Sequence, residues 1–352
     1  MRRPRALRLT AILLAGGLLV ACGADEPTET GTPAPTGGTS TGAVPTVAGA
    51  FGEAPQVELP AGAAADELVI EVLDEGDGDP VAEGELVIAD YQTVVWPAGD
   101  ESATATAEDG GPDRDEPLFD TFASGLPEPL LVSEQGLLPG MVAGLVDAKV
   151  GSRILVVLPP SEGFGEAGNA ELGVGPDDAL VFVFDLLDSF AGDETAEGTA
   201  VDQAPGGPTV AEGDEGPTVT VPATTPPTEL VVQPLVEGTD SAVEAGQVIV
   251  VQYRGLLWKD GSEFDSTWAK GQATGFVIGT GNVIPGWDKA LVGLAVGSRV
   301  LLTIPPADGY GPEGNPPTIA GDDTLVFVID ILGAYGGAPA SSTPAPTETP
   351  GG

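Results

Sequence analysis

The sequence predicts an α+β protein in which two similar domains, each with one short helix among antiparallel strands, are joined by linkers. Three observations support this prediction. Two long stretches repeat each other, strand and helix periodicities follow one another within the better-preserved copy, and segments rich in Pro, Gly and Thr flank both copies. A chain of 352 residues has room for two domains together with linkers.

The composition excludes several classes of function. The formal net charge is −42, from 54 acidic and 12 basic side chains, and such a surface repels nucleic-acid phosphates and anionic lipid headgroups. We therefore expect no nucleic-acid partner, and any membrane attachment must be covalent or by insertion. The acidity favours solubility. Calcium binding is the alternative, although the chain has no Asp-x-Asp-x-Asp-Gly loop.

The chain contains no histidine and a single cysteine, Cys22. A Ser-His-Asp triad, a Cys/His zinc site and an intrachain disulfide are therefore impossible. We expect no metal and no cofactor, and a function that needs neither a histidine base nor a thiolate.

The amino terminus has the pattern of an export signal. A head with four arginines precedes an apolar run, Leu9–Val20, that is too short for a comfortable transmembrane helix. A signal peptide cleaved after a small residue is one interpretation. Because the only cysteine follows Leu19-Val20-Ala21, the segment also resembles the signal of bacterial lipoproteins, in which Cys22 becomes the lipidated first residue. This resemblance implies a signal peptide over 1–22 and a lipid anchor on the extracytoplasmic face of the cell membrane.

Three segments contain too little bulky apolar surface to offset the entropy cost of ordering. We expect a disordered tether over 23–65, a Pro/Gly/Thr-rich linker over 191–227 and a disordered tail over 336–352. Between them lie the two expected domains, over 66–190 and 228–335.

The two domains are related by an internal repeat. Tyr91 matches Tyr253 at an offset of 162, as Trp96 matches Trp258, whereas Phe119-Asp120 matches Phe264-Asp265 at an offset of 145. The difference, 162 − 145, places an insertion of 17 residues before Phe119, in an acidic stretch typical of a loop. The later matched blocks are Leu138-Pro139-Gly140-Met141 with Ile284-Pro285-Gly286-Trp287, Pro159-Pro160 with Pro305-Pro306, Gly163-Phe164-Gly165 with Gly309-Tyr310-Gly311, and Leu180-Val181-Phe182-Val183 with Leu325-Val326-Phe327-Val328.

The second copy shows strand and helix periodicities and gathers aromatic residues. Residues 248–255 alternate as in a half-buried strand, and strands are also expected over 299–304 and 325–331. Pro285 suits the first position of a short helix that ends near Gly297, and its apolar stripe is Trp287, Leu291 and Leu294. Only 5% of the chain is aromatic, so the rings gathered here predict a pocket; they include Tyr253, Phe264, Phe276, Trp287, Tyr310 and Phe327.

With these blocks in order, the second domain resembles the FKBP-type peptidyl-prolyl cis-trans isomerases. The most specific blocks are Val283-Ile284-Pro285-Gly286-Trp287, Pro305-Pro306, Gly309-Tyr310-Gly311 and Thr324-Leu325-Val326-Phe327. Their order and spacing follow the family's pattern across the whole domain. The resemblance implies two FKBP-like domains, each a twisted antiparallel sheet wrapped over one short helix, with the ligand cleft between helix and sheet.

The resemblance also implies the residues of the site. Trp287 would form the floor of a proline pocket, and Ile284 N–H and the Tyr310 hydroxyl would meet substrate carbonyls. The set expected to carry catalysis is Tyr253, Asp265, Ile284, Trp287, Tyr310 and Phe327, with Phe264, Phe276 and Val283 binding the substrate. Thr274 stands where a second aromatic residue is common in the family, so the cleft edge is expected to be more open.

Such a pocket suits rotation of the peptide bond before proline. The planar amide has partial double-bond character, and its rotation barrier is about 18–20 kcal/mol. Because the twisted amide loses charge separation, an apolar aromatic pocket should favour it over the planar form. Fixed donors can hold the flanking carbonyls while the bond turns, without an acid, a base or a nucleophile.

The first domain is expected to be a degenerate copy with weak or no activity. Met141 stands at the position of Trp287, Phe164 replaces Tyr310 and removes its hydroxyl, and Leu130 or Leu131 stands near the position of Phe276. The expected counterparts of the site are Tyr91, Phe119, Asp120, Leu138, Met141, Phe164 and Phe182. Because methionine adapts to apolar sites, peptide binding can persist in this domain.

Taken one at a time, these residues have simpler explanations: a ring on a strand or helix stripe is usually core, and Asp265 after a turn usually faces solvent. The leading hypothesis is a membrane-tethered isomerase that acts on proline-containing exported polypeptides and is monomeric. Two alternatives stay open. One is a non-catalytic chaperone module in which two clefts grip one client, and the other is a cell-surface spacer formed by the Pro/Thr-rich segments.

Overall fold

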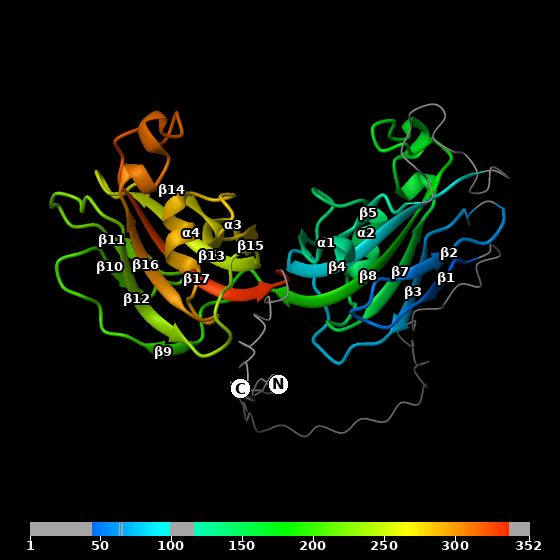
Figure 1. The fold of residues 1–352 in the computed structure, drawn as a ribbon, viewed down its shortest axis with the longest axis horizontal. Helices are drawn as coiled ribbons and strands as arrows, with labels where there is room; N and C mark the ends of the chain where they lie inside the picture. Colours follow the sequence, from blue (N-terminus) through cyan, green and yellow to red (C-terminus); the bar gives the residue numbers. More distant parts are fainter. Residues whose placement is uncertain (1–43, 63, 65, 99–115, 338–352) are drawn as a thin grey trace, which may run out of the picture. The chain divides into compact units, whose positions relative to one another are not determined.

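The computed structural model describes residues 44–62, 64, 66–98 and 116–337 (Figure 1). The expected signal segment with Cys22, most of the insertion loop and the tail from residue 338 lie outside these ranges. Within them the fold is α+β, with antiparallel sheets and few short helices, as predicted. None of the helices in these ranges is long and apolar enough to cross a membrane.

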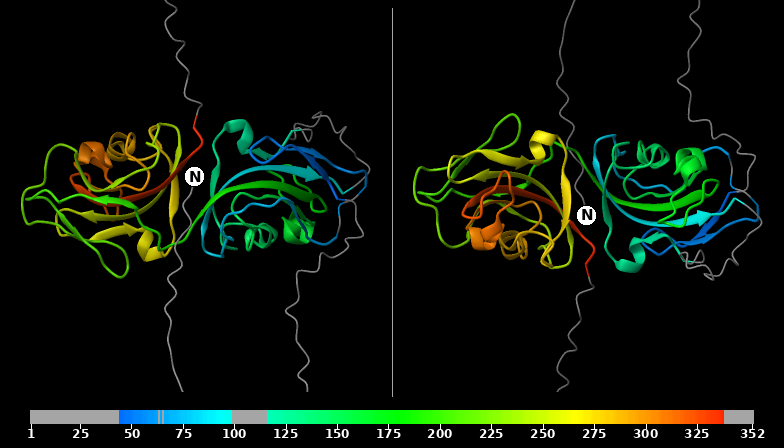
Figure 2. Two further views of the ribbon diagram at one scale, coloured as in Figure 1. Left: turned by 90° about the horizontal axis from the view of Figure 1, so that it is seen from below. Right: turned by 90° about the horizontal axis from the view of Figure 1, so that it is seen from above.

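The second domain is built on one sheet with the strand order β14-β13-β17-β16-β12-β9, and β15 also pairs with β13. Its strands are β9 (Gly198–Ala200), β12 (Val231–Gly238), β13 (Val248–Leu257), β14 (Glu263–Ser266), β15 (Thr274–Val277), β16 (Arg299–Ile304) and β17 (Leu325–Tyr335). The helices are α3 (Thr267–Lys270) and α4 (Pro285–Leu291), with 3₁₀ turns at Pro306–Asp308 and Gly311–Glu313. The sheet is twisted, as the long red strand β17 shows (Figure 2).

The helix α4 lies against the sheet of the second domain (Figure 1). Pro285 occupies its first turn, where the missing N–H is not needed. Gly286 brings the helix close to β16, because a Cβ there would lie 2.7 Å from the Ile304 side chain. The helix ends at Leu291 and not near Gly297 as predicted, since the chain turns at Gly293 with a φ of +90°.

The first domain repeats this architecture with the strand order β3-β7-β8-β4-β5, and β6 pairs with β4. Its strands are β3 (Val69–Asp74), β4 (Leu86–Trp96), β5 (Phe119–Asp120), β6 (Glu128–Leu131), β7 (Arg153–Leu158) and β8 (Ala179–Phe190). Its helices are α1 (Thr121–Ser124) and α2 (Pro139–Leu145), with 3₁₀ turns at Pro160–Glu162 and Gly165–Ala167.

Each sheet is covered on both faces. Along β17, Phe327 and Ile329 pack in the core that includes α4, whereas Val326 and Val328 pack in a separate cluster. Because side chains alternate along a strand, the two sets lie on opposite faces. We refer to the face under α4, or under α2 in the first domain, as the inner face and to the other as the outer face.

The segments expected to be unstructured are partly folded. The expected linker over 191–227 contains β9, β10 (Thr209–Ala211) and β11 (Thr218–Thr220), and the expected tether over 23–65 contains β1 (Thr46–Ala48) and β2 (Gln56–Glu58). The pairs β1–β2 and β10–β11 are antiparallel hairpins.

Composition was misleading here because a few valines carry the packing. Val210 is buried against the outer face of the second sheet, and Val219 and Val221 pack beside it. Val47 and Val57 pack in the same way against the outer face of the first sheet.

A tryptophan holds the chain that follows each hairpin. The Nε1–H of Trp96 donates to the carbonyl of Gly62 at 2.9 Å, and the Nε1–H of Trp258 donates to the carbonyl of Thr224 at 2.9 Å. Each tryptophan lies 34 residues after its acceptor. The repeat therefore includes these hairpins as well as the two sheets.

A buried ion pair also lies on each outer face. Arg153 donates to both oxygens of Asp185, at 2.6 and 2.8 Å, and Arg299 donates to both oxygens of Asp330, at 2.5 and 2.7 Å. The hairpins complete both sites: Arg153 also donates to the carbonyl of Gly49 at 2.8 Å, and Arg299 to the carboxylate of Glu212 at 2.5 Å. Such pairs need these extra partners, since burying an ion is costly.

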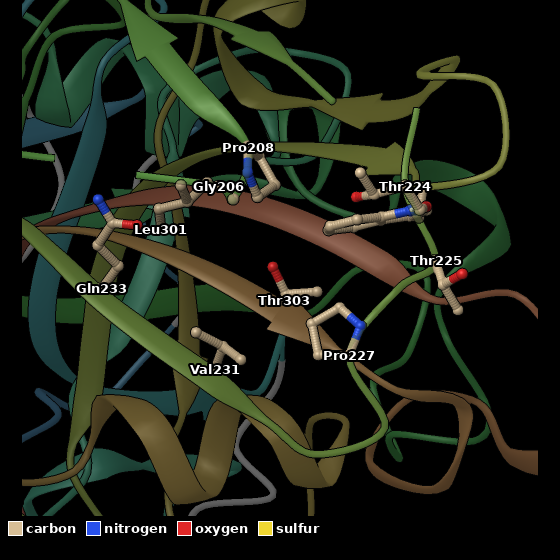
Figure 3. Close-up of a pocket in the computed structure, with 11 residues that line it drawn as sticks. Gly206, Pro208, Thr224, Thr225, Pro227, Val231, Gln233, Leu301 and Thr303 are labelled. Carbon is tan, nitrogen blue, oxygen red and sulfur yellow. Dashed lines mark hydrogen bonds between the residues drawn. The ribbon is translucent and has the colours of Figure 1, made fainter. Parts of the chain in front are cut away.

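A pocket of about 310 Å³ lies where the flanks of the β10–β11 hairpin cross the outer face (Figure 3). Its lining is uncharged and consists of Gly206, Gly207, Pro208, Thr224, Thr225, Pro227, Val231, Gln233, Trp258, Leu301 and Thr303. The resemblance implies a cleft between the helix and the sheet, which is the inner face, so this pocket is not the expected cleft.

Candidate active site

Aromatic rings of the second domain meet on the inner face of its sheet. Tyr253 comes from β13, Phe264 from β14, Phe276 from β15, Trp287 from α4 and Phe327 from β17. Their contacting centroids are between 5.3 and 6.4 Å apart, and several pairs are edge to face. This arrangement is favoured because the edge of a ring is positive and its face negative. The structure thus brings these five rings into one group, which we call the ring cluster.

Trp287 is at the centre of the ring cluster. It is 4% exposed, and its ring is nearly perpendicular to the rings of Tyr253, Phe276 and Phe327, at 81°, 90° and 82°. Its indole N–H is buried and has no hydrogen-bond partner among the described residues. An unpaired buried donor costs about 1–3 kcal/mol, so an acceptor brought by a ligand would be stabilised there.

A polar network lies at the rim of the ring cluster. The Tyr253 hydroxyl donates to the Asp265 carboxylate, and Lys270 Nζ donates to Asp265 Oδ1 at 2.6 Å. Burial alone would raise the pKa of Asp265, but the hydrogen bonds from Lys270 and Tyr253 hold this pKa below its ordinary value. Burial, with Asp265 beside it, raises the pKa of Tyr253. At neutral pH the site therefore holds an ionised carboxylate and a protonated hydroxyl.

The sequence reasoning missed Lys270. The helix α3 is a single turn, capped by the Ser266 hydroxyl, which accepts from Ala269 N–H at 3.2 Å, and ended by Gly271 with a φ of +68°. This turn folds Lys270 back onto Asp265. A basic residue just before the glycine of a capped turn was the available signal.

Of the two predicted carbonyl-binding groups, Ile284 packs against the core that contains the ring cluster, and Tyr310 does not. Ile284 is the N-cap of α4, and its backbone N–H donates to no acceptor in the part of the chain that the structure describes. Tyr310 precedes the second 3₁₀ turn and is 39% exposed. Its ring makes no contact with the rings of the ring cluster, so the sixth predicted ring lies outside that group. Val283 is half-buried and packs against the core.

Gly255 is a second residue that the sequence reasoning missed. A Cβ at this position would lie 2.6 Å from Cζ of Phe264 and 2.8 Å from Cε1 of Phe327. The glycine therefore lets these two rings meet edge to face at 5.5 Å. Thr93 stands at this position in the first domain. Tyr91 matches Tyr253 in the sheet register, and Thr93 and Gly255 each lie two residues further along the strand.

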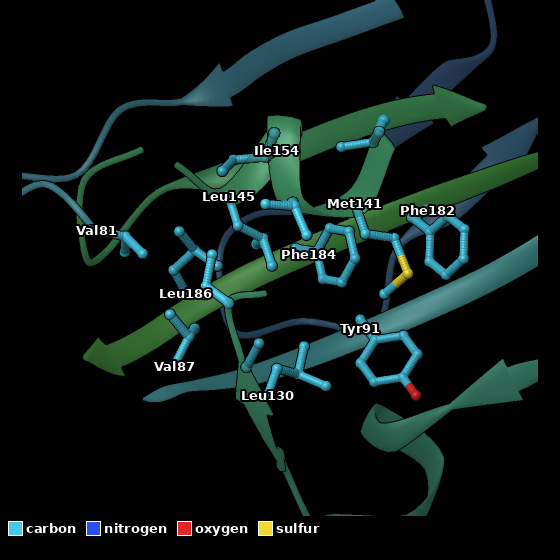
Figure 4. Close-up of a cluster of buried hydrophobic side chains, with 14 of the residues drawn as sticks. Val81, Val87, Tyr91, Leu130, Met141, Leu145, Ile154, Phe182, Phe184 and Leu186 are labelled. Carbon is cyan, nitrogen blue, oxygen red and sulfur yellow. The ribbon is translucent and has the colours of Figure 1, made fainter. Parts of the chain in front are cut away.

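In the first domain the predicted apolar counterparts other than Phe119 lie together, but different side chains fill the space between helix and sheet. Figure 4 shows Met141 beside Tyr91 and Phe182. Phe184, which stands at the position of Ile329, stacks on Phe182 at 5.5 Å and 0°. Leu138 and Phe164 pack against the same core. The first domain thus has Phe184 where the second has Ile329, and Thr93 where the second has Gly255.

The predicted positions of Phe119 and Asp120 in the site are wrong by one residue. Asp120 pairs with Gln92 in the sheet and caps α1 by accepting from Ala123 N–H at 3.0 Å, which is the role of Ser266 and not of Asp265. Phe119 is 43% exposed and does not pack with the core. Leu118 stands instead at the position of Phe264. The offset of 146 that fits the downstream blocks, applied to Asp120, would have revealed this.

The polar network of the first domain is also different. With no carboxylate at the position of Asp265, the Tyr91 hydroxyl donates to Glu128 at 2.6 Å. Glu128 stands at the position of Thr274, and Leu130, not Leu131, at that of Phe276. Ser124 stands at the position of Lys270, so the network has no cation. The first domain therefore keeps a tyrosine–carboxylate hydrogen bond, now made with Glu128, and loses the carboxylate at the position of Asp265 and the cation at that of Lys270.

The arrangement in the second domain can hold an apolar group against the ring cluster and offer hydrogen-bond donors at its rim. Among the residues described, no three His, Cys, Asp or Glu side chains are grouped so that they could hold a metal ion. The chemistry that the geometry supports is binding and reorientation of a peptide segment.

An antiparallel sheet that wraps over one short helix, with aromatic rings filling the space between them, defines an FKBP-like domain. The model of the family described as FKBP-type peptidyl-prolyl cis-trans isomerase matches residues 81–187 and 239–332. The chain therefore belongs to this family, whose activity is peptidyl-prolyl cis-trans isomerisation.

Similar proteins match a part of the chain that is about as long as one of its domains. The FK506-binding protein of Streptomyces anulatus is 39% identical over 119 residues, which are 34% of this chain and 96% of the relative. The peptidyl-prolyl cis-trans isomerase FKBP15-1 of Arabidopsis thaliana is 43% identical over 109 residues, 31% of this chain and 70% of the relative. The crystal structure of FkpA from Escherichia coli is 32% identical and covers 36% of this chain and 52% of that one, with a TM-score of 0.29.

Proposed function

We propose that the second domain catalyses cis-trans isomerisation of the peptide bond before proline, and that the first domain is weak or inactive. The observation that carries this proposal is that the ring cluster and the Tyr253–Asp265–Lys270 network meet at one site of the second domain. The first domain has no indole and no cation at the matching positions, and its tyrosine hydroxyl donates to Glu128, which comes from another strand.

The residues act by position and environment. Trp287 would support the proline ring, since its face is apolar and it is enclosed by three other rings. The free N–H of Ile284 and the Tyr310 hydroxyl would hold the carbonyls on either side of the bond. A planar amide is more polar than a twisted one, so the apolar surface of the ring cluster stabilises the twisted state selectively. The Asp265 carboxylate fixes the Tyr253 ring by accepting from its hydroxyl.

The test uses the full chain and a proline-containing tetrapeptide whose isomerisation is followed optically. Trp287→Ala should remove most of the acceleration, and Met141→Ala in the first domain should leave it unchanged. Equal losses in both variants would contradict the assignment to the second domain. No acceleration by the unmodified, folded chain would contradict the activity itself.

A second candidate is a chaperone module that binds proline-bearing segments without catalysis. The observation that favours it is the first domain, which keeps an apolar site of three rings and a methionine although it lacks the indole and the cation of the second domain. Suppression of client aggregation that persists in the Trp287→Ala variant, and is lost only when Met141 is also replaced, would support this function.

We also propose that the chain is a lipoprotein that acts on exported or cell-surface polypeptides as a monomer. The support is the sequence Leu19-Val20-Ala21-Cys22 after an apolar run. Metabolic labelling with a fatty acid should mark the protein in membrane fractions, and Cys22→Ser should abolish the label and release the protein. Labelling that is unchanged in Cys22→Ser would exclude this anchor.

A further inference from the structure

The second domain carries a part that the family model does not match. The match begins at residue 239, whereas the β10–β11 hairpin lies at 209–220 on the outer face of the sheet. It packs against buried side chains of that face, namely Trp258, Trp268, Leu301, Val326 and Val328. The hairpin thus removes an apolar surface from water.

The tip of the hairpin contacts the helix that carries Lys270. Gly216 has a φ of +84° and lies so close to Trp268 that a Cβ built on it would be 2.5 Å from Cγ of the indole. Trp268 is 9% exposed and lies in α3, between Asp265 and Lys270 in the sequence. Because Asp265 and Lys270 pair across this turn, the indole supports the turn from behind.

The same tip holds the strand that carries Tyr253. Arg254 Nη1 donates to the carbonyl of Pro217 at 2.8 Å, and Nη2 donates to the carbonyl of Glu215 at 3.1 Å. Arg254 Nε also forms an ion pair with Glu263 of β14 at 2.9 Å. One tip therefore contacts both segments whose side chains meet in the polar network.

The first domain lacks this double contact within its described residues. Gln92 stands at the position of Arg254 and donates to Asp120 at 3.1 Å. Phe122 stands at the position of Trp268, and the guanidinium of Arg153 lies over its ring at 5.8 Å. The β1–β2 hairpin binds Arg153 and so reaches α1 only indirectly. The domain with the direct contact is the one with the complete network.

We propose that the tip of the β10–β11 hairpin is a positioning element for the isomerase site. Through Trp268 and Arg254 it fixes the Asp265–Lys270 turn relative to Tyr253. This inference rests on the proposed function of the second domain. A displacement of about 1 Å in a positioned group can cost about a hundredfold in rate, so a small shift of the turn is measurable.

The experiment compares variants of the full chain. Gly216→Ala forces the tip away from the indole, and Arg254→Gln introduces the first-domain residue and removes both carbonyl contacts. Gly206→Ala is the matched control in the same segment, because Gly206 also has a positive φ, +92°, and a Cβ there meets nothing within 4 Å. Trp268→Phe, combined with Gly216→Ala, makes room for the added methyl group and should restore function in part, because the strain of an alanine at a φ of +84° remains.

Two readouts are needed. We expect kcat/KM to fall about tenfold in Gly216→Ala and Arg254→Gln, to stay unchanged in Gly206→Ala and to recover in part in the double variant. In parallel, the ¹³Cζ resonance of Tyr253, one of four tyrosines and assignable by Tyr253→Phe, should move in the two affected variants only. Hydrogen exchange of the β13 amides reports whether the domain stays folded.

Unchanged kcat/KM together with an unchanged Tyr253 resonance would overturn the proposal. It would also be overturned if the loss of activity matched the fraction of unfolded domain. If the unmodified chain shows no isomerase activity, the proposed function fails, and the Tyr253 resonance alone then decides whether the hairpin positions the network.

Discussion

Replacing Trp287 by methionine, the residue at this position in the first domain, should destabilise the second domain and remove its activity. The change deletes three ring contacts, with centroid distances of 5.3, 5.5 and 5.3 Å. Each edge-to-face pair contributes about 0.5–1.5 kcal/mol beyond the buried area. Methionine recovers part of the apolar contact because it is flexible, so we expect a net loss of about 2–3 kcal/mol.

Hydrogen exchange measures this loss domain by domain, which is necessary because one unfolding free energy does not describe a two-domain chain. Amides of β13, residues 248–257, report on the second domain, and amides of β4, residues 86–96, are the internal control. Since about 1.36 kcal/mol is a factor of ten, β13 exchange should become about 30- to 150-fold faster. Exchange in β4 should not change.

An acceleration of less than about fivefold in β13, or an equal one in β4, would refute the central place given to the indole. The isomerase assay on the same sample is an independent check, because wild-type kcat/KM would mean that Trp287 is not the floor of the site. The reverse change, Met141→Trp, should not create activity in the first domain, since it restores neither the carboxylate nor the cation.

Three further variants test other parts of the structure. Gly255→Ala places a Cβ 2.6 Å from a neighbouring ring, so kcat/KM should fall while the fold persists by circular dichroism; unchanged turnover would mean that this ring contact is unimportant. Burial would raise the pKa of Asp265, but hydrogen bonds from Lys270 and Tyr253 hold this pKa below the ordinary value of 3.8. The ionised Asp265 therefore stabilises the folded second domain fully above pH 3.8, and this contribution is lost as the pH falls through the lower folded-state pKa. An acid unfolding profile that Asp265→Asn leaves unaltered would contradict this. Asp330→Asn leaves the buried Arg299 with the largely exposed Glu212 as its remaining counter-ion, so the free energy of unfolding, followed by exchange of the β17 amides, should fall by up to about 3–5 kcal/mol. A loss below about 1 kcal/mol would mean that the pair contributes no more than an exposed one.

The fold and the composition of the ring cluster could be predicted because they rest on order and spacing. Pro285 and the blocks around Trp287 specify a helix start beside a strand, and alternation along 248–255 specifies which side chains face it. Lys270 and Gly255 could not be found in this way. Their roles depend on a one-turn helix that folds back and on the approach of two rings, which exist only after the strands have paired.

The hairpins were missed for a related reason. Val210 and Val219 are scattered in a segment whose Pro, Gly and Thr content is typical of disorder, and their partners on the outer face lie far along the chain. The shifted position of Asp120 was a different error, since a matching Phe-Asp pair was aligned although the neighbouring blocks required one residue more.

The hydrogen bonds from Trp96 to Gly62 and from Trp258 to Thr224 also affect where the chain can be divided into separate domains. A recombinant fragment that begins at residue 228, the start of the domain predicted from the sequence, would lack the β10–β11 hairpin. Val326 and Val328, which the hairpin covers, would then be exposed to water. Such a fragment should self-associate in solution, whereas a fragment that begins before Gly198 should be monodisperse.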